Sequence, residues 1–334
     1  MFIGVIFLLR ISNLKVSLEE MIQNCDKVFI LPHLNPDFDA IASSVGMSLF
    51  VNECNKESRI IIGDAEGEIK EGVKAMIDVS REYAPFDCLK KYERTKGSND
   101  LHILCDVNKP KLTCIKSIDK DHLAIVDHHN QDAETFEAAL SHIDTTKSSA
   151  SEIVTALLTS KRIKIPKKLA DILYAGILLD TDKLNNHIKG NTHRIIARLV
   201  DFGATLPEAR EYFTEDVYSN RIVEKLVENA QILNYRIGIM PGDEKMKYKT
   251  EELARAANEL LTKKVDATFA IGNIGDGVVS ISARSNNVFD SGQIMGQLSG
   301  GGGPNSAATK LEGVSVAEAT KQLKKALYFT KQEA

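Results

Sequence analysis

Four short runs rich in Val, Ile and Leu, each followed within two positions by an acidic or imidazole residue, constrain the fold of this chain more than any other feature. Helical patterns separate the runs, and this alternation is typical of parallel strands that are buried on both faces. We therefore predict an α/β domain whose strands all end beside polar residues. The runs are residues 28–31, 101–105, 123–126 and 175–179, and the residues that follow them are His33, Asp106, the triplet Asp127, His128 and His129, and Asp180.

The carboxyl ends of parallel strands meet at one edge of a sheet, where open α/β sheets bind their ligands. The segment after the first run adds Asp37 and Asp39 to this edge. Several carboxylates gathered in a crevice repel one another, and a bound cation compensates for that repulsion. Oxygen and imidazole ligands without thiolate suit Mn or Mg better than a structural zinc ion. Six such ligands are enough for two metal ions that share one bridging carboxylate, an arrangement used in phosphoryl transfer.

Each of these residues taken alone has an ordinary structural explanation. Asp37 or Asp39 is a suitable N-cap for a helix that begins near Ala40. His33 alone is compatible with a surface histidine, and Asp180 alone with an acid at the end of a strand. Four such clusters at the ends of strands favour the functional interpretation.

The same segments resemble the DHH phosphoesterase family, in the form that carries a DHH-associated C-terminal domain. The resemblance covers most of the chain. Its segments are HLNPDFDAIASS (residues 33–44), CDVNKP (105–110), VDHHN (126–130) and GILLDTD (176–182), followed by ISARS (281–285) and IMGQLSGGGGPNSAATKL (294–311).

The resemblance implies a dinuclear Mn site, with Mg or Co as alternative metals. Asp106 would bridge the two ions, His129 would face the scissile phosphate or its leaving group, and Asp127 would orient a histidine. One ion would be held by His33, Asp37 and Asp106, and the other by Asp39, Asp106, His128 and Asp180.

Within the family, the C-terminal segments most resemble the phosphodiesterase module of the membrane-anchored cyclic-di-AMP phosphodiesterases. The resemblance implies substrate binding by Ser282, Arg284 and the glycine run Gly300, Gly301, Gly302 and Gly303. Glycine-rich turns allow backbone N–H groups to approach phosphate closely, and arginine offers a charged fork. The alternative is a flexible turn between two helices. Two residues depart from the family pattern: Pro304 stands where a histidine usually follows the glycines, and Leu184 near the usual position of a phenylalanine.

Composition and length limit the class of protein. A chain of 334 residues exceeds one typical domain, so we expect two. With 46 acidic against 42 basic residues, the chain does not suit nonspecific binding to duplex nucleic acid. The odd number of cysteines, five, indicates reduced thiols and a cytoplasmic protein. The apolar residues 1–9 are too few to span a membrane, and we interpret them as a core or pairing strand or a hydrophobic tag.

We predict three segments: a DHH catalytic domain with a parallel sheet and helices on both faces (1–199), a helical connecting arm (200–232) and a smaller mixed-sheet α/β domain that binds substrate (233–334). The active site is expected in the cleft between the domains. In the second domain, residues 235–240 are expected to form a strand, and residues 265–272 and 278–285 a hairpin. Helix starts are predicted at Ser149-x-x-Glu152 and Ser315-x-x-Glu318, the second helix ending near Leu327.

The expected function is hydrolysis of cyclic-di-AMP to pApA, and onward to AMP, by metal-activated water. One alternative is a nanoRNase that acts on pApA and other short oligonucleotides. A pyrophosphatase is less favoured, because its C-terminal domain lacks the nucleotide-type glycine turn. A second alternative is a nucleotide-binding sensor with little turnover, against which the six retained ligands argue. A small nucleotide is thus the expected partner, and the sequence leaves homodimer formation open.

Overall fold

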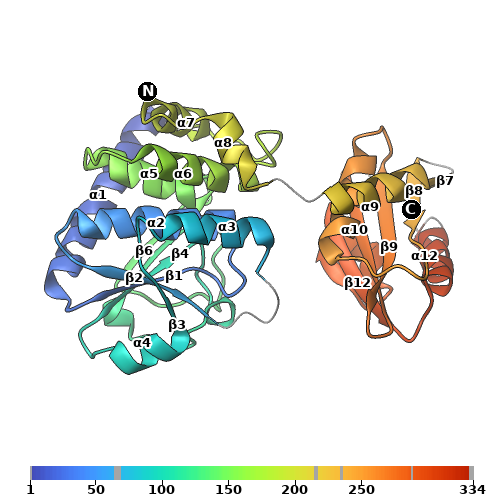
Figure 1. The fold of residues 1–334 in the computed structure, drawn as a ribbon, viewed down its shortest axis with the longest axis horizontal. Helices are drawn as coiled ribbons and strands as arrows, with labels where there is room; N and C mark the ends of the chain where they lie inside the picture. Colours follow the sequence, from blue (N-terminus) through green and yellow to red (C-terminus); the bar gives the residue numbers. More distant parts are fainter. Residues whose placement is uncertain (1, 64–68, 214–216, 234–235, 287–288, 331–334) are drawn as a thin grey trace. The chain divides into compact units, whose positions relative to one another are not determined.

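The computed structural model describes residues 2–63, 69–213, 217–233, 236–286 and 289–330. The chain divides into two compact units, Met1–Thr214 and Glu215–Ala334. Each unit has its own sheet and its own hydrophobic core, and Figure 1 shows the elements of both along the chain. The predicted connecting arm is divided between them, because its first helix packs on the first unit and its second helix on the second.

The sheet of the first unit is parallel throughout, as predicted. In the described residues its strand order is β3-β2-β1-β4-β5-β6, so the direction of winding reverses between β1 and β4. This is the topological switch point at which open α/β sheets bind ligands. The strands are β1 (Val28–Leu31), β2 (Ser58–Ile62), β3 (Phe86–Cys88), β4 (Leu101–Cys105), β5 (Leu123–Asp127) and β6 (Leu140–Ile143).

Helices cover both faces of this sheet. One face carries a thick helical layer and the other carries α4 with the loops around it (Figure 1). The α-helices of the unit are α1 (Phe2–Asn24), α2 (Phe38–Asn52), α3 (Glu71–Ser80), α4 (Leu89–Thr95), α5 (Ala150–Ser160), α6 (Lys167–Asp180), α7 (Thr192–Asp201) and α8 (Leu206–Glu211), and two short 3₁₀ helices are Pro110–Leu112 and Lys120–His122.

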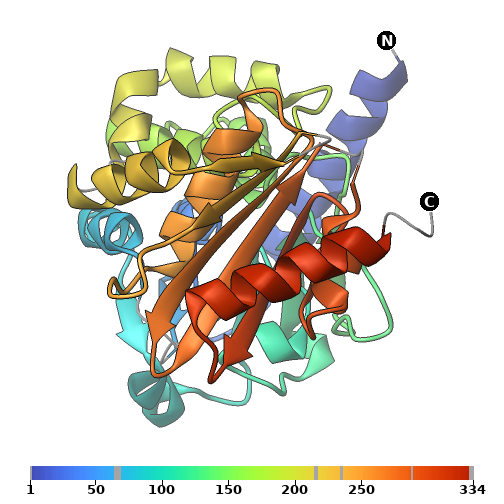
Figure 2. The ribbon, with the colours of Figure 1, turned by 90° about the vertical axis from the view of Figure 1, so that its right-hand side faces the viewer.

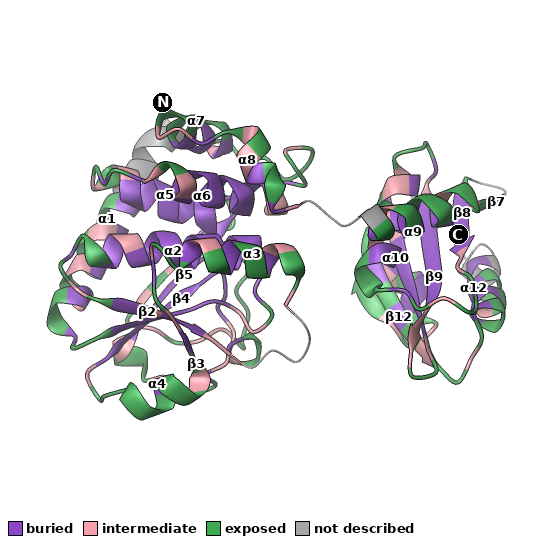
Figure 3. Ribbon diagram, in the orientation of Figure 1, coloured by how far each residue is buried: buried purple, intermediate pink, exposed green. Residues whose placement is uncertain are grey.

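Successive side chains of each strand point to opposite faces of the sheet. Because apolar side chains lie on both faces, both faces are buried by helices or loops. On β1, Val28 and Ile30 face the larger core with α2 and α6, whereas Phe29 and Leu31 face the smaller core around Tyr92. Every residue of β1 is buried. Helices α2 and α6 are also buried over most of their length, as the purple ribbons of Figure 3 show. The continuous apolar run on β1 therefore reflects burial on both sides.

Two predictions of local structure in this unit were wrong. Residues 175–179 lie within helix α6, so Asp180 is the last residue of a helix and not of a strand. A short apolar run does not distinguish a buried strand from a buried helix. Residues 2–9 are helical as part of α1 rather than a strand, and Met1 lies outside the described residues. None of the helices in the described part of the chain is both long and apolar enough to cross a membrane.

The second unit contains a mixed sheet with helices on its two faces. Its strand order over the described residues is β11-β12-β10-β9-β8-β7, with β8 and β9 parallel and the other neighbours antiparallel. Helix α12 lies across one face of the sheet (Figure 2). Helices α9 and α10 pack on the other. The elements are α9 (Val217–Glu228), β7 (Gln231–Leu233), β8 (Ile237–Pro241), α10 (Thr250–Leu261), β9 (Ala267–Gly275), β10 (Val278–Ser285), α11 (Ser291–Gly296), β11 (Gly301–Gly303), β12 (Ser306–Glu312) and α12 (Val316–Thr330).

The predicted hairpin of the second unit is confirmed. Strands β9 and β10 pair antiparallel and turn at Asp276 and Gly277, whose φ angles are 51° and 73°. Positive φ at both central positions is the signature of a type I′ turn, which glycine and aspartate tolerate. The predicted strand near residues 235–240 is β8, and Tyr235 lies outside the described residues. Ser315 accepts a hydrogen bond from Glu318 N at 3.1 Å, as the predicted helix start requires.

Candidate metal centre

The carboxyl ends of β1, β4 and β5 bring the predicted residues together. His33 and Asp37 lie in the loop from β1 to α2, Asp106 follows β4, and the triplet follows β5. The ligand atoms of His33, Asp37 and Asp106 lie within 4.8 Å of one another, as do those of Asp39, Asp106, His128 and Asp180. These two groups are the two ligand sets that the family resemblance implied.

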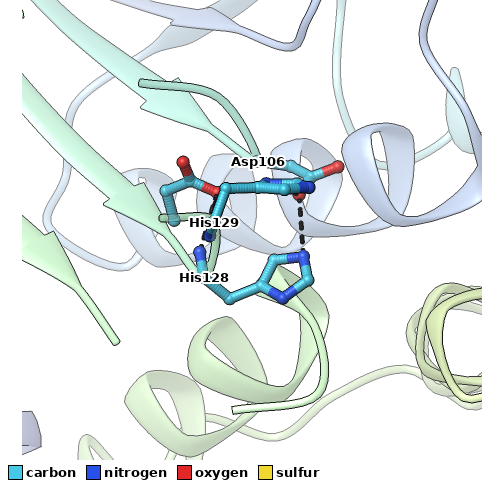
Figure 4. A group of neighbouring side chains, drawn as sticks. Asp106, His128 and His129 are labelled. Atoms are coloured by element: carbon cyan, nitrogen blue, oxygen red, sulfur yellow. Dashed lines mark hydrogen bonds and ion pairs between the residues drawn. The ribbon is translucent and has the colours of Figure 1, made fainter. Parts of the chain in front are cut away.

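Asp106 belongs to both groups. Its Oδ2 lies 3.8 Å from His33 Nε2, and its Oδ1 lies 3.3 Å from His128 Nε2 and 3.5 Å from His129 Nδ1. Figure 4 shows both histidine side chains close to this carboxylate. The backbone of Asp106 is left-handed, with φ 61°, a strained conformation of the kind found at functional sites. One carboxylate with an oxygen facing each group has the geometry expected of a bridging ligand.

Helices α2 and α6 supply Asp39 and Asp180 of the second group. Asp180, at the end of α6, places Oδ2 3.2 Å from His128 Nε2. Asp39, in the first turn of α2, accepts hydrogen bonds from the backbone N–H groups of Ala150 (2.7 Å) and Ser151 (2.8 Å) at the start of α5. The N-terminus of a helix stabilises a carboxylate. Ser149 caps α5, as predicted, but the Glu152 carboxylate bonds Ser148 N and not Ser149 N.

Asp37 has the capping role considered for it as well as a place in the first group. Its Oδ1 accepts hydrogen bonds from Asp39 N and Ala40 N, while its Oδ2 lies 3.7 Å from His33 Nε2. The two explanations of this residue are therefore compatible, because each uses a different oxygen of the carboxylate.

Asp127 orients His129. Its Oδ1 accepts hydrogen bonds from the backbone N–H groups of His128 and His129, at 2.7 and 3.2 Å, and lies 2.9 Å from His129 Nδ1. This leaves Nε2 of His129 as the nitrogen available to a ligand. Burial opposes the ionised form of Asp127, but its contacts with His129 outweigh that effect and lower its pKa. The bond to Asp127 raises the pKa of His129.

The electrostatics of the cluster favour a bound cation. Burial, followed by repulsion from Asp180, raises the pKa of Asp39 to about 7. Burial and the charge of Asp39 raise the pKa of Asp106 well above its usual value. Burial opposes a charge on His128, but Asp106 and Asp180 outweigh it and raise its pKa to about 11. The cluster therefore retains protons that a metal ion would displace.

Buried polar atoms without hydrogen-bond partners also favour a bound cation. Asp106 Oδ1, His128 Nε2 and Asp180 Oδ2 are buried and have no hydrogen-bond partner. Buried polar atoms without partners are rare and call for an explanation such as an ion. The donor set is oxygen and imidazole nitrogen without thiolate. These residues therefore fit divalent cations such as Mn²⁺ or Mg²⁺.

Gly176 is a site residue whose role the sequence did not reveal. A Cβ at this position of α6 would lie 2.3 Å from Ser151 Oγ and 3.0 Å from Asp39 Oδ1. Only glycine lets α6 approach Asp39 and the start of α5 this closely. The signal in the sequence was a glycine within an otherwise apolar run, which often marks a close approach of the backbone to a neighbouring element.

The predicted substrate-binding residues lie together in the second unit. Ser282 and Arg284 on β10 pair through β12 with Gly301 and Gly303, respectively. The glycine run is mostly an edge strand, β11, rather than a turn, and Gly301, Gly302 and Gly303 are exposed. Ser282 is buried, and Arg284 is half-buried with Nη1 donating to Ala283 O. Burial lowers the pKa of Arg284.

Pro304 is held in the tight connection between β11 and β12. Its carbonyl oxygen accepts hydrogen bonds from Ser291 N at 2.7 Å and from Ser285 Oγ at 2.8 Å. The next residue, Asn305, accepts a hydrogen bond from Ser285 N. The backbone at the position of the missing histidine is thus fixed by its neighbours.

The fold and this cluster of ligands define a DHH-type protein with two domains. Residues 27–177 match the DHH family, N-terminal domain, and residues 229–329 match the DHHA1 domain. The chain therefore carries a DHH family N-terminal domain followed by a DHHA1 domain.

Among curated proteins, the chain is 32% identical over 322 residues to "Cyclic-di-AMP phosphodiesterase GdpP" of Geobacillus thermodenitrificans, covering 93% of this chain and 49% of that protein. It is 30% identical over 327 residues to the protein of the same name from Bacillus subtilis, covering 94% and 49%. The chain thus spans about half the length of these relatives. A shorter match, 30% over 159 residues, is to "Probable bifunctional oligoribonuclease and PAP phosphatase NrnA" of Streptococcus mutans, covering 47% and 46%.

Among solved structures, an exopolyphosphatase-related protein from Bacteroides fragilis has a TM-score of 0.79 at 20% identity, covering 95% of this chain and 96% of that one. At this identity the likeness establishes the fold alone.

Proposed function

We propose that this chain is a metal-dependent phosphodiesterase that hydrolyses cyclic-di-AMP to pApA, with onward cleavage to AMP. The observation that carries the proposal is the position of Asp106, whose two carboxylate oxygens face two separate groups of ligand atoms. The identity of 30 to 32% to two cyclic-di-AMP phosphodiesterases over more than nine tenths of this chain supports this choice of substrate.

Each residue of the cluster has a role in this mechanism. His33 and Asp37 would hold one ion, and Asp39, His128 and Asp180 the other, with Asp106 shared. A pair of divalent cations acidifies water and neutralises the charge that develops on a phosphoryl group. Mn is the expected metal, with Mg or Co as alternatives.

His129 acts as the general acid in this mechanism. Asp127 holds Nδ1 of the imidazole, so that a proton on Nε2 can pass to the leaving oxygen. The hydrogen bond to Asp127 raises the pKa of His129, which favours the protonated form of the ring. Its side chain is 58% exposed, as a group that meets an incoming substrate must be. Ser282, Arg284 and Gly300–Gly303 are expected to bind the nucleotide.

The second candidate is a nanoRNase that cleaves pApA and other short oligonucleotides. The match of about half of the chain to a probable oligoribonuclease favours it. Pro304 changes a residue expected near the substrate phosphate and removes no metal ligand. Such a change alters substrate preference and leaves catalysis in place, so it favours the nanoRNase over the sensor.

Separate reactions with cyclic-di-AMP and with pApA, in the presence of Mn²⁺ and followed by chromatography, distinguish these functions. We expect the cyclic compound to disappear first while pApA accumulates. Rapid conversion of pApA with an inert cyclic substrate would establish the nanoRNase instead. Tight nucleotide binding without product over hours would establish the sensor.

A further inference from the structure

A surface pocket of about 320 Å³ lies in the first unit, and none of the roles proposed above uses it. Among the described residues, it is lined by Lys183, Asn185, Arg210 and Phe213. They come from the segment that follows α6 and from α8 with the residues after it. A pocket of this size, with cations beside an aromatic ring, suits part of a nucleotide.

Two connections place this pocket next to the metal centre. Lys183 follows the ligand Asp180 by three residues. The Phe213 ring lies edge-on to the Phe38 ring, with 4.6 Å between their centroids, and Phe38 stands between Asp37 and Asp39 in the chain. The pocket is therefore within reach of a substrate whose phosphate occupies the centre.

The charges of the pocket are available to a ligand. Lys167 and Lys168 of α6 pair with Asp171 and Glu208. Lys183 and Arg210, in contrast, pair with no carboxylate in the described parts of the chain. Lys183 Nζ lies 5.7 Å from the centre of the Phe213 ring. Both cations are exposed.

The backbone around Lys183 holds it in place. Asp182, Lys183 and Leu184 have φ angles of 46°, 57° and 70°, three consecutive residues in the left-handed region. Lys183 N donates a hydrogen bond to Leu178 O at 2.7 Å, and Leu184 N to Thr181 Oγ1 at 3.2 Å. Such strain persists only where the surrounding structure enforces it, and it occurs at ligand-binding sites.

We propose that Lys183 and Arg210 bind the second phosphate of a dinucleotide, with Phe213 forming the apolar wall beside its nucleoside. This inference rests on the proposed function, because it takes the first phosphate to lie at the metal centre. The subsite would select substrates that contain two phosphates over simple phosphodiesters.

The test compares the double variant Lys183→Met, Arg210→Gln with the wild type on pApA and on bis(p-nitrophenyl) phosphate, which has one phosphate and cannot reach the subsite. We expect KM for pApA to rise by about tenfold or more, the effect of losing hydrogen bonds to charged groups. The kcat/KM for the one-phosphate substrate should stay within about twofold, since the chemistry at the metals is untouched. The double variant Lys189→Met, Arg198→Gln removes two exposed cations outside the pocket and serves as the matched control.

The two proposals fail in different ways. If the wild type cleaves both substrates and the pocket variant keeps its KM for pApA, or if the control variant changes KM equally, the subsite is refuted while the proposed function stands. If the wild type cleaves neither of these substrates and also leaves cyclic-di-AMP intact, the proposed function fails. In that case, calorimetric titration of the protein with pApA in the presence of Mn²⁺ measures the binding affinity without turnover. If the pocket variant binds pApA more weakly than the wild type, the subsite is supported. If the two proteins bind pApA equally well, or if the wild type does not bind it, the subsite is refuted.

Discussion

At the scale of single residues, Asp106 shows a conflict between stability and function. The carboxylate is buried among three other acids, and its contact with His128 offsets part of their repulsion. Its backbone is also left-handed. Ionisation of this buried carboxylate without full compensation costs free energy, so we expect the charged form of Asp106 to destabilise the metal-free protein. A metal ion would reverse the sign of that contribution.

The substitution Asp106→Asn tests this conflict. We expect the metal-free variant to be at least as stable as the wild type at pH 8, because a neutral amide of the same shape removes the repulsion. We also expect Mn²⁺ to lose its stabilising effect and phosphodiesterase activity to vanish. Thermal unfolding with and without Mn²⁺, together with a turnover assay, measures all three. Asp201→Asn, at an exposed acid paired with Arg198, is the control. Full activity of Asp106→Asn would contradict the bridging role.

Asp127→Asn is expected to change the pH dependence of the reaction. Loss of the carboxylate lowers the pKa of His129, because the bond to Asp127 is the largest contribution that raises it. A general acid works only below its pKa, so the alkaline limb of the kcat profile should move to lower pH. We also expect kcat to fall by about tenfold to a hundredfold, as for other residues that orient a catalytic side chain. An unmoved alkaline limb would argue against His129 as the acid.

The residues of the centre were largely accessible to sequence analysis, because strand ends and motif order indicate which side chains meet. What remained hidden were contacts that depend on tertiary packing. Asp39 is held by the start of α5, more than a hundred residues away in sequence, and no local pattern encodes that partner. The same applies to the pocket formed by Lys183, Arg210 and Phe213.

At the scale of elements, the close approach of α2, α5 and α6 positions Asp39 and Asp180. Gly176 permits this approach, and Gly46 on α2 has a similar role, since a Cβ there would lie 2.7 Å from Val154 Cγ1. The close packing of α2, α5 and α6 therefore depends on two positions where a side chain does not fit.

Gly176→Ala is expected to destabilise the protein and to weaken metal binding together. The new methyl group would overlap Ser151 Oγ, and overpacking of this kind costs about 1 to 3 kcal/mol. Because it would also press on Asp39, Mn²⁺ affinity should fall. Denaturant unfolding and Mn²⁺ titration measure the two effects. Gly190→Ala is the matched control, since no atom lies within 4 Å of a Cβ there. If both variants behave alike, packing at Gly176 does not position the ligands.

Strands β1, β4 and β5 were predictable because each is a short apolar run buried on both sides. The same logic failed at residues 175–179, where a helix is buried on all sides and shows no polar face to reveal its period. The glycine run was expected to be a turn, but pairing with β12 makes Gly301–Gly303 a strand. Strand pairing depends on a partner, and the propensity of glycine carries no information about it.

At the scale of the whole molecule, the two units have separate cores. The first unit buries two clusters on either side of its parallel sheet, and the second buries two others around its mixed sheet. All the proposed metal ligands belong to the first unit. Units with their own cores can unfold as separate transitions.

Calorimetric unfolding of the whole chain should therefore show two transitions, of which Mn²⁺ raises only one. A ligand at 100 times its Kd adds about 2.7 kcal/mol to the stability of the unit that binds it. For a unit of this size, that shifts the midpoint by about 5 to 10 °C. Gly176→Ala assigns the transition, because it lowers the midpoint of the first unit alone. If Mn²⁺ raised both midpoints equally, or if one transition covered the whole chain, the units would be thermodynamically coupled. Stabilisation of only the transition that Gly176→Ala leaves unchanged would place the metal outside the cluster around Asp106.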